Sequence, residues 1–219
     1  MRKTASEIIR NLEMRIARLE KQSRRDVLEL DEDGDKSLIV FTSPNDIKGT
    51  ATLTFTHKVG SDDQWLFLPA IQRTKRISSS NKSGPFVGSE FAYEDISSQE
   101  LEKYTYKYLR NEDYGGLDCF VVEYDPVDRK SGYSKQIVWI DSKEYRSHKI
   151  EFYDRKESLL KTLVYTGYTK YNDKFWRADV FEMQNHQTGK KTILNFEDWE
   201  FQTGLSAKDF NKKSLKKVR

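Results

Sequence analysis

From residue 25 onward, the chain consists of short apolar runs that are broken by turn-forming residues roughly every 8 to 12 positions. Glycine, aspartate and asparagine at these joints tolerate the tight turns that β-hairpins require. Several runs are apolar in both side-chain directions, among them residues 38–41, 65–68, 120–122 and 137–140. Both faces of a sheet made from such strands must be covered, or one face must line an enclosed space. The pattern predicts a mainly β (α+β) protein with a strongly curved antiparallel sheet and a few helices on its concave side.

The expected strands cover residues 26–30, 37–42, 49–57, 64–68, 73–78, 104–109, 117–124, 135–141, 147–154, 159–171, 175–185 and 191–201. Residues 1–20 are expected to form an amphipathic helix, because apolar side chains recur on one helical face and Thr4 and Glu7 form a capping-box pair. A second, short helix is expected near residues 97–103. We expect one domain over residues 1–219, because single β-sheet domains reach this size.

Charge and cysteine content restrict the function classes. The chain has 38 basic and 35 acidic residues, a net charge of +3, which gives no reason to expect a nucleic-acid partner. Cys119 is the only cysteine, so an intrachain disulfide is excluded, and its apolar surroundings favour a buried, inert thiol. The first residues contain no apolar signal-peptide core, and no window approaches the roughly 18 apolar residues of a membrane span.

The sequence offers no arrangement that predicts an enzyme, a cofactor or a metal site. His57, His148 and His186 lie far apart and do not show the spacing of metal ligands. A nucleophile elbow, a phosphate-binding lysine motif and a dinucleotide-binding glycine motif are all missing. Neighbouring acids such as Glu94 and Asp95 would point to opposite faces of a strand, which does not suit a general acid and base pair.

A cationic stretch runs from Arg73 to Arg76 and is followed by acidic residues. Contact with nucleic-acid phosphates is one interpretation, but a charged strand edge that discourages edge-to-edge pairing is the simpler one. Glu90, Glu94 and Asp95 follow closely and could pair with Arg73 and Arg76 across strands. We therefore name Arg73, Arg76, Glu94 and Asp95 as candidates for an ionic network.

The many aromatic residues suit a core, but together they also suit a ligand wall. An acyl chain that enters an unfilled apolar interior gains about 0.8 kcal/mol for each buried methylene group. Alternation along the strands selects one set of candidate cavity-lining residues, and a register slip of one residue would exchange the two faces. The set is Leu38, Val40, Leu53, Phe55, Trp65, Phe67, Phe120, Val122, Val138 and Ile140.

Several segments together carry a resemblance to a known family. They are SLIVFTSPNDIKGT at residues 37–50, DQWLFLP at 63–69, RTKRISSSNK at 73–82 and FVGSEFAYED at 86–95, with further matches at 152–155 and 160–163. In combination these segments resemble the LolA-like outer-membrane lipoprotein-sorting proteins, over about residues 37–210.

The resemblance implies a half-open β-barrel with a helical lid over an apolar cavity that accepts the acyl chains of lipoproteins or of other lipids. It implies a periplasmic location, a signal peptide removed from the mature chain, and an inner-membrane exporter and an outer-membrane acceptor as partners. In the family an arginine holds the lid; Arg73 and Arg76 are candidates here only by their proximity to Glu94 and Asp95. The alternative is a periplasmic sensor or interaction module on the same scaffold that docks a protein partner.

Overall fold

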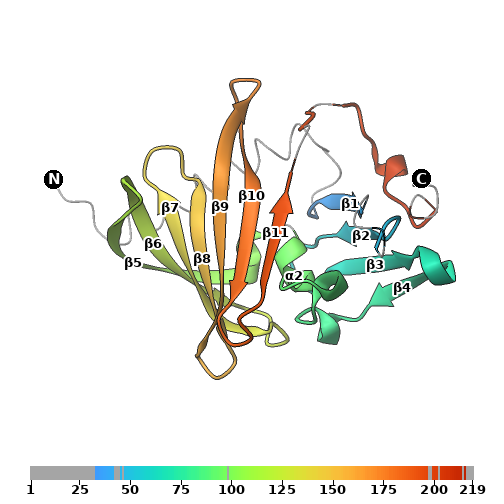
Figure 1. Ribbon diagram of the computed structural model, residues 1–219, viewed down its shortest axis with the longest axis horizontal. Coiled ribbons are helices and arrows are strands. Elements are labelled where there is room, and N and C mark those ends of the chain that lie inside the picture. The colour runs from blue at the N-terminus through green and yellow to red at the C-terminus, as the bar shows by residue number, and fades with distance from the viewer. Residues whose placement is uncertain are drawn as a thin grey trace.

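We analysed the protein as a computed structural model. The structure describes residues 33–41, 45, 47–97, 99–196, 199–201, 203–213 and 215. The helix expected over residues 1–20 and the strand expected at 26–30 lie outside these residues. The described part is mainly β, with antiparallel sheets and few helices, so the predicted fold class is confirmed at this level (Figure 1).

The strands form two antiparallel meanders. The small sheet contains, in order, β1 (Lys36–Val40), β2 (Ala51–Phe55), β3 (Asp63–Leu68) and β4 (Arg73–Ile77). The large sheet contains β5 (Tyr104–Tyr114), β6 (Leu117–Pro126), β7 (Tyr133–Asp141), β8 (Ser147–Asp154), β9 (Leu159–Tyr171), β10 (Phe175–Asn185) and β11 (Lys191–Asn195), each paired with its neighbour in sequence. Within each sheet, consecutive strands are joined as antiparallel neighbours, as the regular spacing of turn residues predicts.

The prediction of a single, strongly curved sheet is wrong. The two sheets are separate, and neither is closed or strongly curled, so the half-open barrel is not confirmed. The division falls in residues 78–103, which lack strand alternation. Val87 and Gly88 adopt φ values of +49° and +77°, and Pro85 has no amide hydrogen for a strand ladder.

The segment that links the two sheets is built from short helical turns. They are the 3₁₀ turns η2 (Ser79–Asn81), η3 (Phe86–Gly88) and η4 (Leu101–Lys103) and the single-turn helix α2 (Tyr93–Ile96). A further 3₁₀ turn, η1 (Pro69–Ile71), joins β3 to β4. Among the described residues of the range 97–103 that was expected to be helical, helical structure is limited to η4. The Ala92 amide donates to Asp95 Oδ2 at 2.6 Å, which fixes the start of α2.

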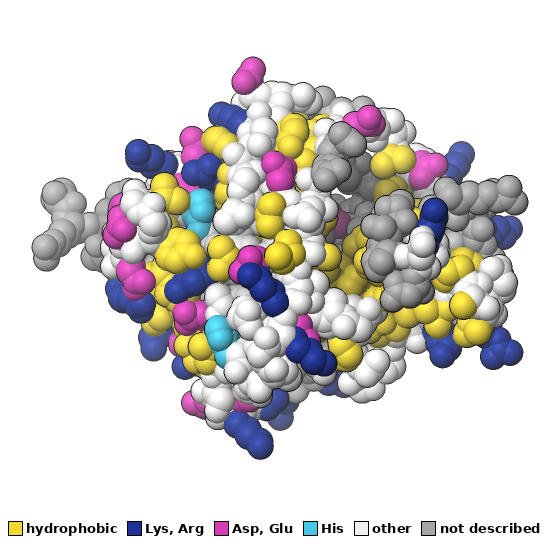
Figure 2. All heavy atoms as spheres, in the orientation of Figure 1, with side chains coloured by type: hydrophobic (Ala, Val, Ile, Leu, Met, Phe, Trp, Pro, Cys, Tyr) yellow, Lys and Arg dark blue, Asp and Glu magenta, His cyan; other side chains and the backbone are white. Residues whose placement is uncertain are grey.

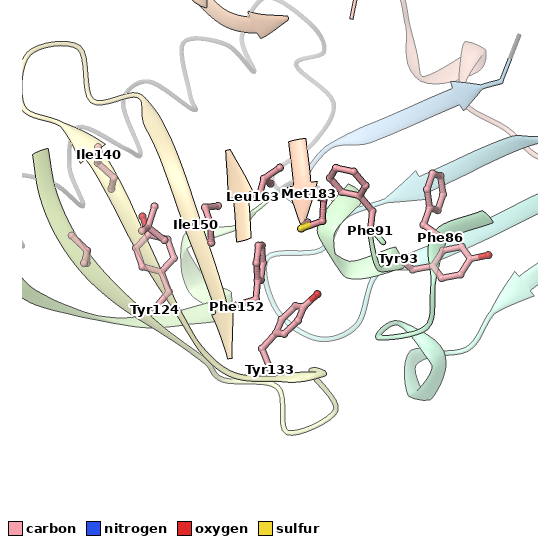
Figure 3. Close-up of a cluster of buried hydrophobic side chains, with 12 residues drawn as sticks. Phe86, Phe91, Tyr93, Tyr124, Tyr133, Ile140, Ile150, Phe152, Leu163 and Met183 are labelled. Carbon is pink, nitrogen blue, oxygen red and sulfur yellow. The ribbon is translucent and has the colours of Figure 1, made fainter. Parts of the chain in front are cut away.

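One apolar cluster fills the space between the large sheet and the linking segment. This central cluster consists of Phe86, Phe91, Tyr93, Val122, Tyr124, Tyr133, Val138, Ile140, Ile150, Phe152, Leu163 and Met183. Figure 3 shows that its side chains reach from the strands of the large sheet across to the linking segment beside the small sheet. The cluster defines the inner face of the large sheet, and it ties the two sheets into one packed unit.

The opposite, outer face of the large sheet carries a smaller cluster. Cys119, Val121, Ile137 and Trp139 are its buried members. Burial raises the pKa of the Cys119 thiol to about 11, because the thiolate is disfavoured away from water. The interpretation of Cys119 as a buried thiol with little reactivity at neutral pH is confirmed by this environment.

The C-terminal segment passes from the large sheet to the small sheet (Figure 1). Phe196 packs on Phe181 of β10, with ring centroids 4.6 Å apart. Beyond η5 (Ala207–Asp209), Phe210 and Leu215 pack into an apolar cluster on the small sheet. That cluster also contains Ala51, Leu53, Trp65 and Phe67, so Phe210 and Leu215 cover one face of the small sheet.

Candidate functional site

The ten predicted cavity residues fall into two groups. Leu38, Val40, Leu53, Phe55, Trp65 and Phe67 belong to the small-sheet cluster that the C-terminal segment covers. Phe120, Val122, Val138 and Ile140 belong to the inner face of the large sheet. Within each group the alternation is as expected: Leu53 faces both Leu38 and Trp65, and Val122 faces Val138. The structure does not place the two groups in one shared lining.

The two groups are kept apart by the orientation of the small sheet. Gln64 and Ile77 are partners on the face opposite to Trp65. The Gln64 amide donates to the Tyr93 carbonyl at 3.1 Å, and Ile77 packs on the central cluster. The face with Trp65 therefore points away from the large sheet. The prediction of a single sheet could not find this orientation of the small sheet, because it assumed that all strands share one concave side.

The inner face of the large sheet keeps an apolar band that is only partly covered. Tyr165 and Phe181 face each other across β9 and β10, with rings 4.7 Å apart, and Phe120 stacks on Tyr145 at 6.1 Å. These four side chains and Leu194 pack on the central cluster and remain partly exposed. Figure 2 shows that the surface is hollowed between the two sheets, with apolar atoms inside the hollow. This band is the surface best suited to an apolar ligand.

Most of this band was not predicted from the sequence, although the alternation of apolar residues along the strands indicates it. Tyr165 and Phe181 lie two residues from the buried Leu163 and Met183, and alternate strand residues share a face. Extending the alternation into β9 and β10 would have included both rings. The band continues through Phe196 to Trp199, whose rings stack 5.5 Å apart.

A buried ionic network joins the linking segment to the inner face of the large sheet. Lys161 Nζ lies 2.6 Å from Asp95 Oδ2, and both side chains are almost fully buried, at 4% and 2% exposure. Tyr133 donates its hydroxyl to Asp95 Oδ1 at 2.7 Å, and burial raises the Tyr133 pKa well above its usual value. Glu90 Oε2 accepts from the Asn185 amide at 2.7 Å.

Glu94 extends the same network to the turn before β7. Its carboxylate accepts from Ser131 Oγ and from the Gly132 amide, each at 2.9 Å. Burial raises the Glu94 pKa, and these two hydrogen bonds oppose that rise. A Cβ atom on Gly132 would lie 2.6 Å from the Ser83 Cβ, so the close approach of this turn requires glycine.

The structure corrects the expected partners of this network. Glu94 and Asp95 take part, but Arg76 forms its ion pair with Asp63, and Arg73 lies exposed on β4. The linking segment turns from β4 toward the large sheet, so strand β4 never runs beside Glu94 or Asp95. The group that anchors this segment is Lys161 on β9, and no arginine from β4 holds it.

A polar cleft lies where the small sheet meets the first turns of the large one. Its lining includes Asp62, Lys82, Glu94, Lys103 and Asp128, and it encloses about 60 Å³. Lys103 pairs with Asp62, and Lys82 pairs with Asp128 at 2.7 Å. The cleft has room for a few water molecules, which makes it too small and too polar for an acyl chain.

His57 follows β2 in the small sheet and lies between two aspartates, so its pKa tests the charges around it. Its ring lies 2.8 Å from Asp33 and 3.5 Å from Asp63, and the hydrogen bond to Asp33 raises its pKa. Because the His57 pKa is higher in the folded protein, the contact between His57 and Asp33 contributes its full stabilisation at pH values below the pKa of the unfolded state. This stabilisation is lost as the pH rises through the pKa of the folded state. We expect a nuclear magnetic resonance titration to place the His57 pKa above that of an unfolded peptide.

The variant Asp33→Asn should bring the His57 pKa down, whereas Glu157→Gln, on a distant turn, should leave it in place. An equal pKa in the native protein and in Asp33→Asn would contradict the contact.

Within the described residues, no group of three or more histidine, cysteine or acidic side chains is placed to hold a metal ion. No helix in the same part of the chain has the length and hydropathy to cross a membrane.

Comparison with known proteins gives the relationships of the chain. A family model described as an uncharacterized protein matches residues 33–217, and no curated protein is a significant match. A domain from Vibrio parahaemolyticus, named as a candidate outer membrane lipoprotein-sorting protein, is 58% identical with a TM-score of 0.84. The match covers 86% of this chain and 80% of that one.

Two further solved structures are similar. A DUF1329 family protein from Desulfovibrio piger is 29% identical, with a TM-score of 0.79 and coverage of 84% of this chain and 78% of its own. A LolA superfamily protein from Nitrosomonas europaea is 25% identical, with a TM-score of 0.63 and coverage of 84% and 80%. The chain belongs to the LolA-like family of outer membrane lipoprotein-sorting proteins.

Proposed function

We propose that the protein is a periplasmic carrier that binds the acyl chains of lipoproteins or of other lipids and delivers them toward the outer membrane without chemical conversion. The observation that carries this proposal is the partly exposed apolar band on the inner face of the large sheet. The family relationship supports the same cargo class and an extracytoplasmic location. An inner-membrane exporter and an outer-membrane acceptor are the partners that this role requires.

The physical basis is the transfer of methylene groups from water to aromatic side chains. Each buried methylene contributes about 0.8 kcal/mol, so a chain of about ten gains roughly 8 kcal/mol, which corresponds to about micromolar affinity before the cost of ordering the chain is subtracted. Phe120 is proposed to continue the band formed by Tyr165 and Phe181. Val122, Val138 and Ile140, which are 1 to 3% exposed, are proposed to support this wall from beneath. In this proposal the inner face of the large sheet forms the wall of the site, and the linking segment covers one side of it.

Uptake of a fluorescent fatty acid by the purified protein tests the proposal. Phe181→Asp and Phe120→Asp each place a charge on the inner face, and we expect each to weaken uptake at least tenfold. Ile193→Asp is the matched control, because Ile193 lies on the other face of the same hairpin and is 48% exposed. Circular dichroism establishes that each variant is folded.

Two outcomes would contradict the carrier role. The native protein could fail to take up the fatty acid, or Ile193→Asp could weaken uptake as much as the inner-face variants do. Either result would move the alternative function, a module that docks a protein partner, into first place.

A further inference from the structure

Arg177 lies near the start of β10, and alternation places it on the same strand face as Phe181 and Met183. Its guanidinium carbon lies 5.8 Å from the ring centroid of Trp199 and 5.4 Å from that of Phe201. One guanidinium nitrogen, Nη1, donates to the neighbouring Trp176 carbonyl at 2.9 Å. The charge therefore sits among aromatic rings, at the end of the apolar band.

No carboxylate pairs with Arg177 in the part of the chain that the structure describes. Asp179, the next acid on the same face, accepts instead from the Tyr171 hydroxyl at 3.1 Å and the Trp199 indole at 3.2 Å. Partial burial lowers the pKa of Arg177, since water that would stabilise its charge is displaced. Fully buried cations are ordinarily paired, as Lys161 is with Asp95, whereas the partly buried Arg177 has aromatic rings and a carbonyl beside it.

The rings beside Arg177 form a continuous path into the protein. Trp199 stacks on Phe196, Phe196 packs on Phe181, and Phe181 contacts Tyr165, with centroids 5.5, 4.6 and 4.7 Å apart. Met183 lies six positions after Arg177, which corresponds to about 20 Å along an extended strand. The path thus has a cationic end at Arg177 and an apolar end at the central cluster.

We propose that Arg177 binds the anionic head group, a phosphate or a carboxylate, of a lipid whose acyl chain lies along Phe181 and Tyr165 toward Met183. This inference rests on the proposed carrier function and specifies its cargo as an anionic amphiphile. A planar guanidinium suits both anions, because its fork of donors matches two of their oxygens. The head group would supply the counter-ion that the described residues do not place beside Arg177.

Isothermal titration calorimetry with three ligands of equal chain length tests the proposal. The ligands are dodecyl phosphate and laurate, which are anionic at neutral pH, and monolaurin, which is neutral. We expect the native protein to bind either anion about tenfold more tightly than monolaurin, as one charge-assisted hydrogen bond allows. Arg177→Gln should abolish this preference and leave monolaurin affinity within about twofold, and Arg177→Lys should restore part of it.

Lys170→Gln is the matched control, because Lys170 belongs to the same hairpin but stacks over Trp176 at 5.7 Å. It should keep the full preference for the anions. Equal affinity for the three ligands in the native protein, or an unchanged preference in Arg177→Gln, would overturn the head-group site alone. If none of the ligands binds, the carrier function falls as well. Inorganic phosphate that binds as tightly as dodecyl phosphate would show an anion site that needs no acyl chain, and would overturn the proposal too.

Discussion

Replacing Lys161 by methionine is expected to destabilise the protein by about 3 to 5 kcal/mol, which is the usual effect of removing one partner from a buried ion pair. The Asp95 carboxylate would remain at 2% exposure without its cation. It would keep the Tyr133 hydroxyl and the Ala92 amide, which are hydrogen-bond donors but carry no net charge. Urea unfolding followed by tryptophan fluorescence measures the difference in the free energy of unfolding.

Lys191→Met is the matched control for this experiment. Lys191 pairs with Glu182 on the same sheet, but the two side chains are 44% and 39% exposed. An exposed pair contributes about 0 to 1 kcal/mol, so this variant should stay close to the native protein. Similar losses in the two variants would mean that the Lys161 pair does not anchor the linking segment.

Truncating Phe91 to alanine is expected to lower the free energy of unfolding by roughly 3 to 5 kcal/mol. Phe91 is 1% exposed and belongs to the central cluster, while its carbonyl accepts from the Phe86 amide at 2.7 Å. Its ring fills space between the linking segment and the large sheet, so its removal leaves a cavity that rigid strands on one side cannot close. Urea unfolding provides the measurement.

Leu205→Ala is the control, because Leu205 is 49% exposed and its truncation should change stability by no more than about 0.5 kcal/mol. A loss below 1 kcal/mol for Phe91→Ala would mean that the linking segment is not part of the core. The two large-effect variants act on the same contact, the first through charge and the second through packing.

The strands of the described residues were predictable because their signal is local. Alternation and turn residues located every strand from β1 to β11, including the long β9 and β10. Two ends were wrong: β5 continues to Tyr114 beyond the predicted end at 109, and β11 stops at Asn195 before the predicted end at 201. The division into two sheets was not predictable in this way, because it depends on which edge strands pair. Edge pairing is set by residues 78–103, where short turns leave no periodic pattern to follow.

The candidate site shows the same limit. The alternation of Val122 and Val138 could be predicted, and extending it would have reached Tyr165 and Phe181. The partner of Asp95 could not be predicted, because Lys161 lies 66 residues away in sequence. Proximity in sequence favoured Arg73 and Arg76, but contacts between distant segments are decided by the packing of whole elements.

The carrier role is tested most directly by native mass spectrometry of the full chain purified from the periplasm of a Gram-negative host. The expected result is a population with added mass that releases an acyl-bearing lipid or lipopeptide on solvent extraction. This population should be smaller in the Phe181→Asp variant and unchanged in the Ile193→Asp variant. A native protein that is found only at its bare mass, and that also fails to take up a fluorescent fatty acid, would contradict it.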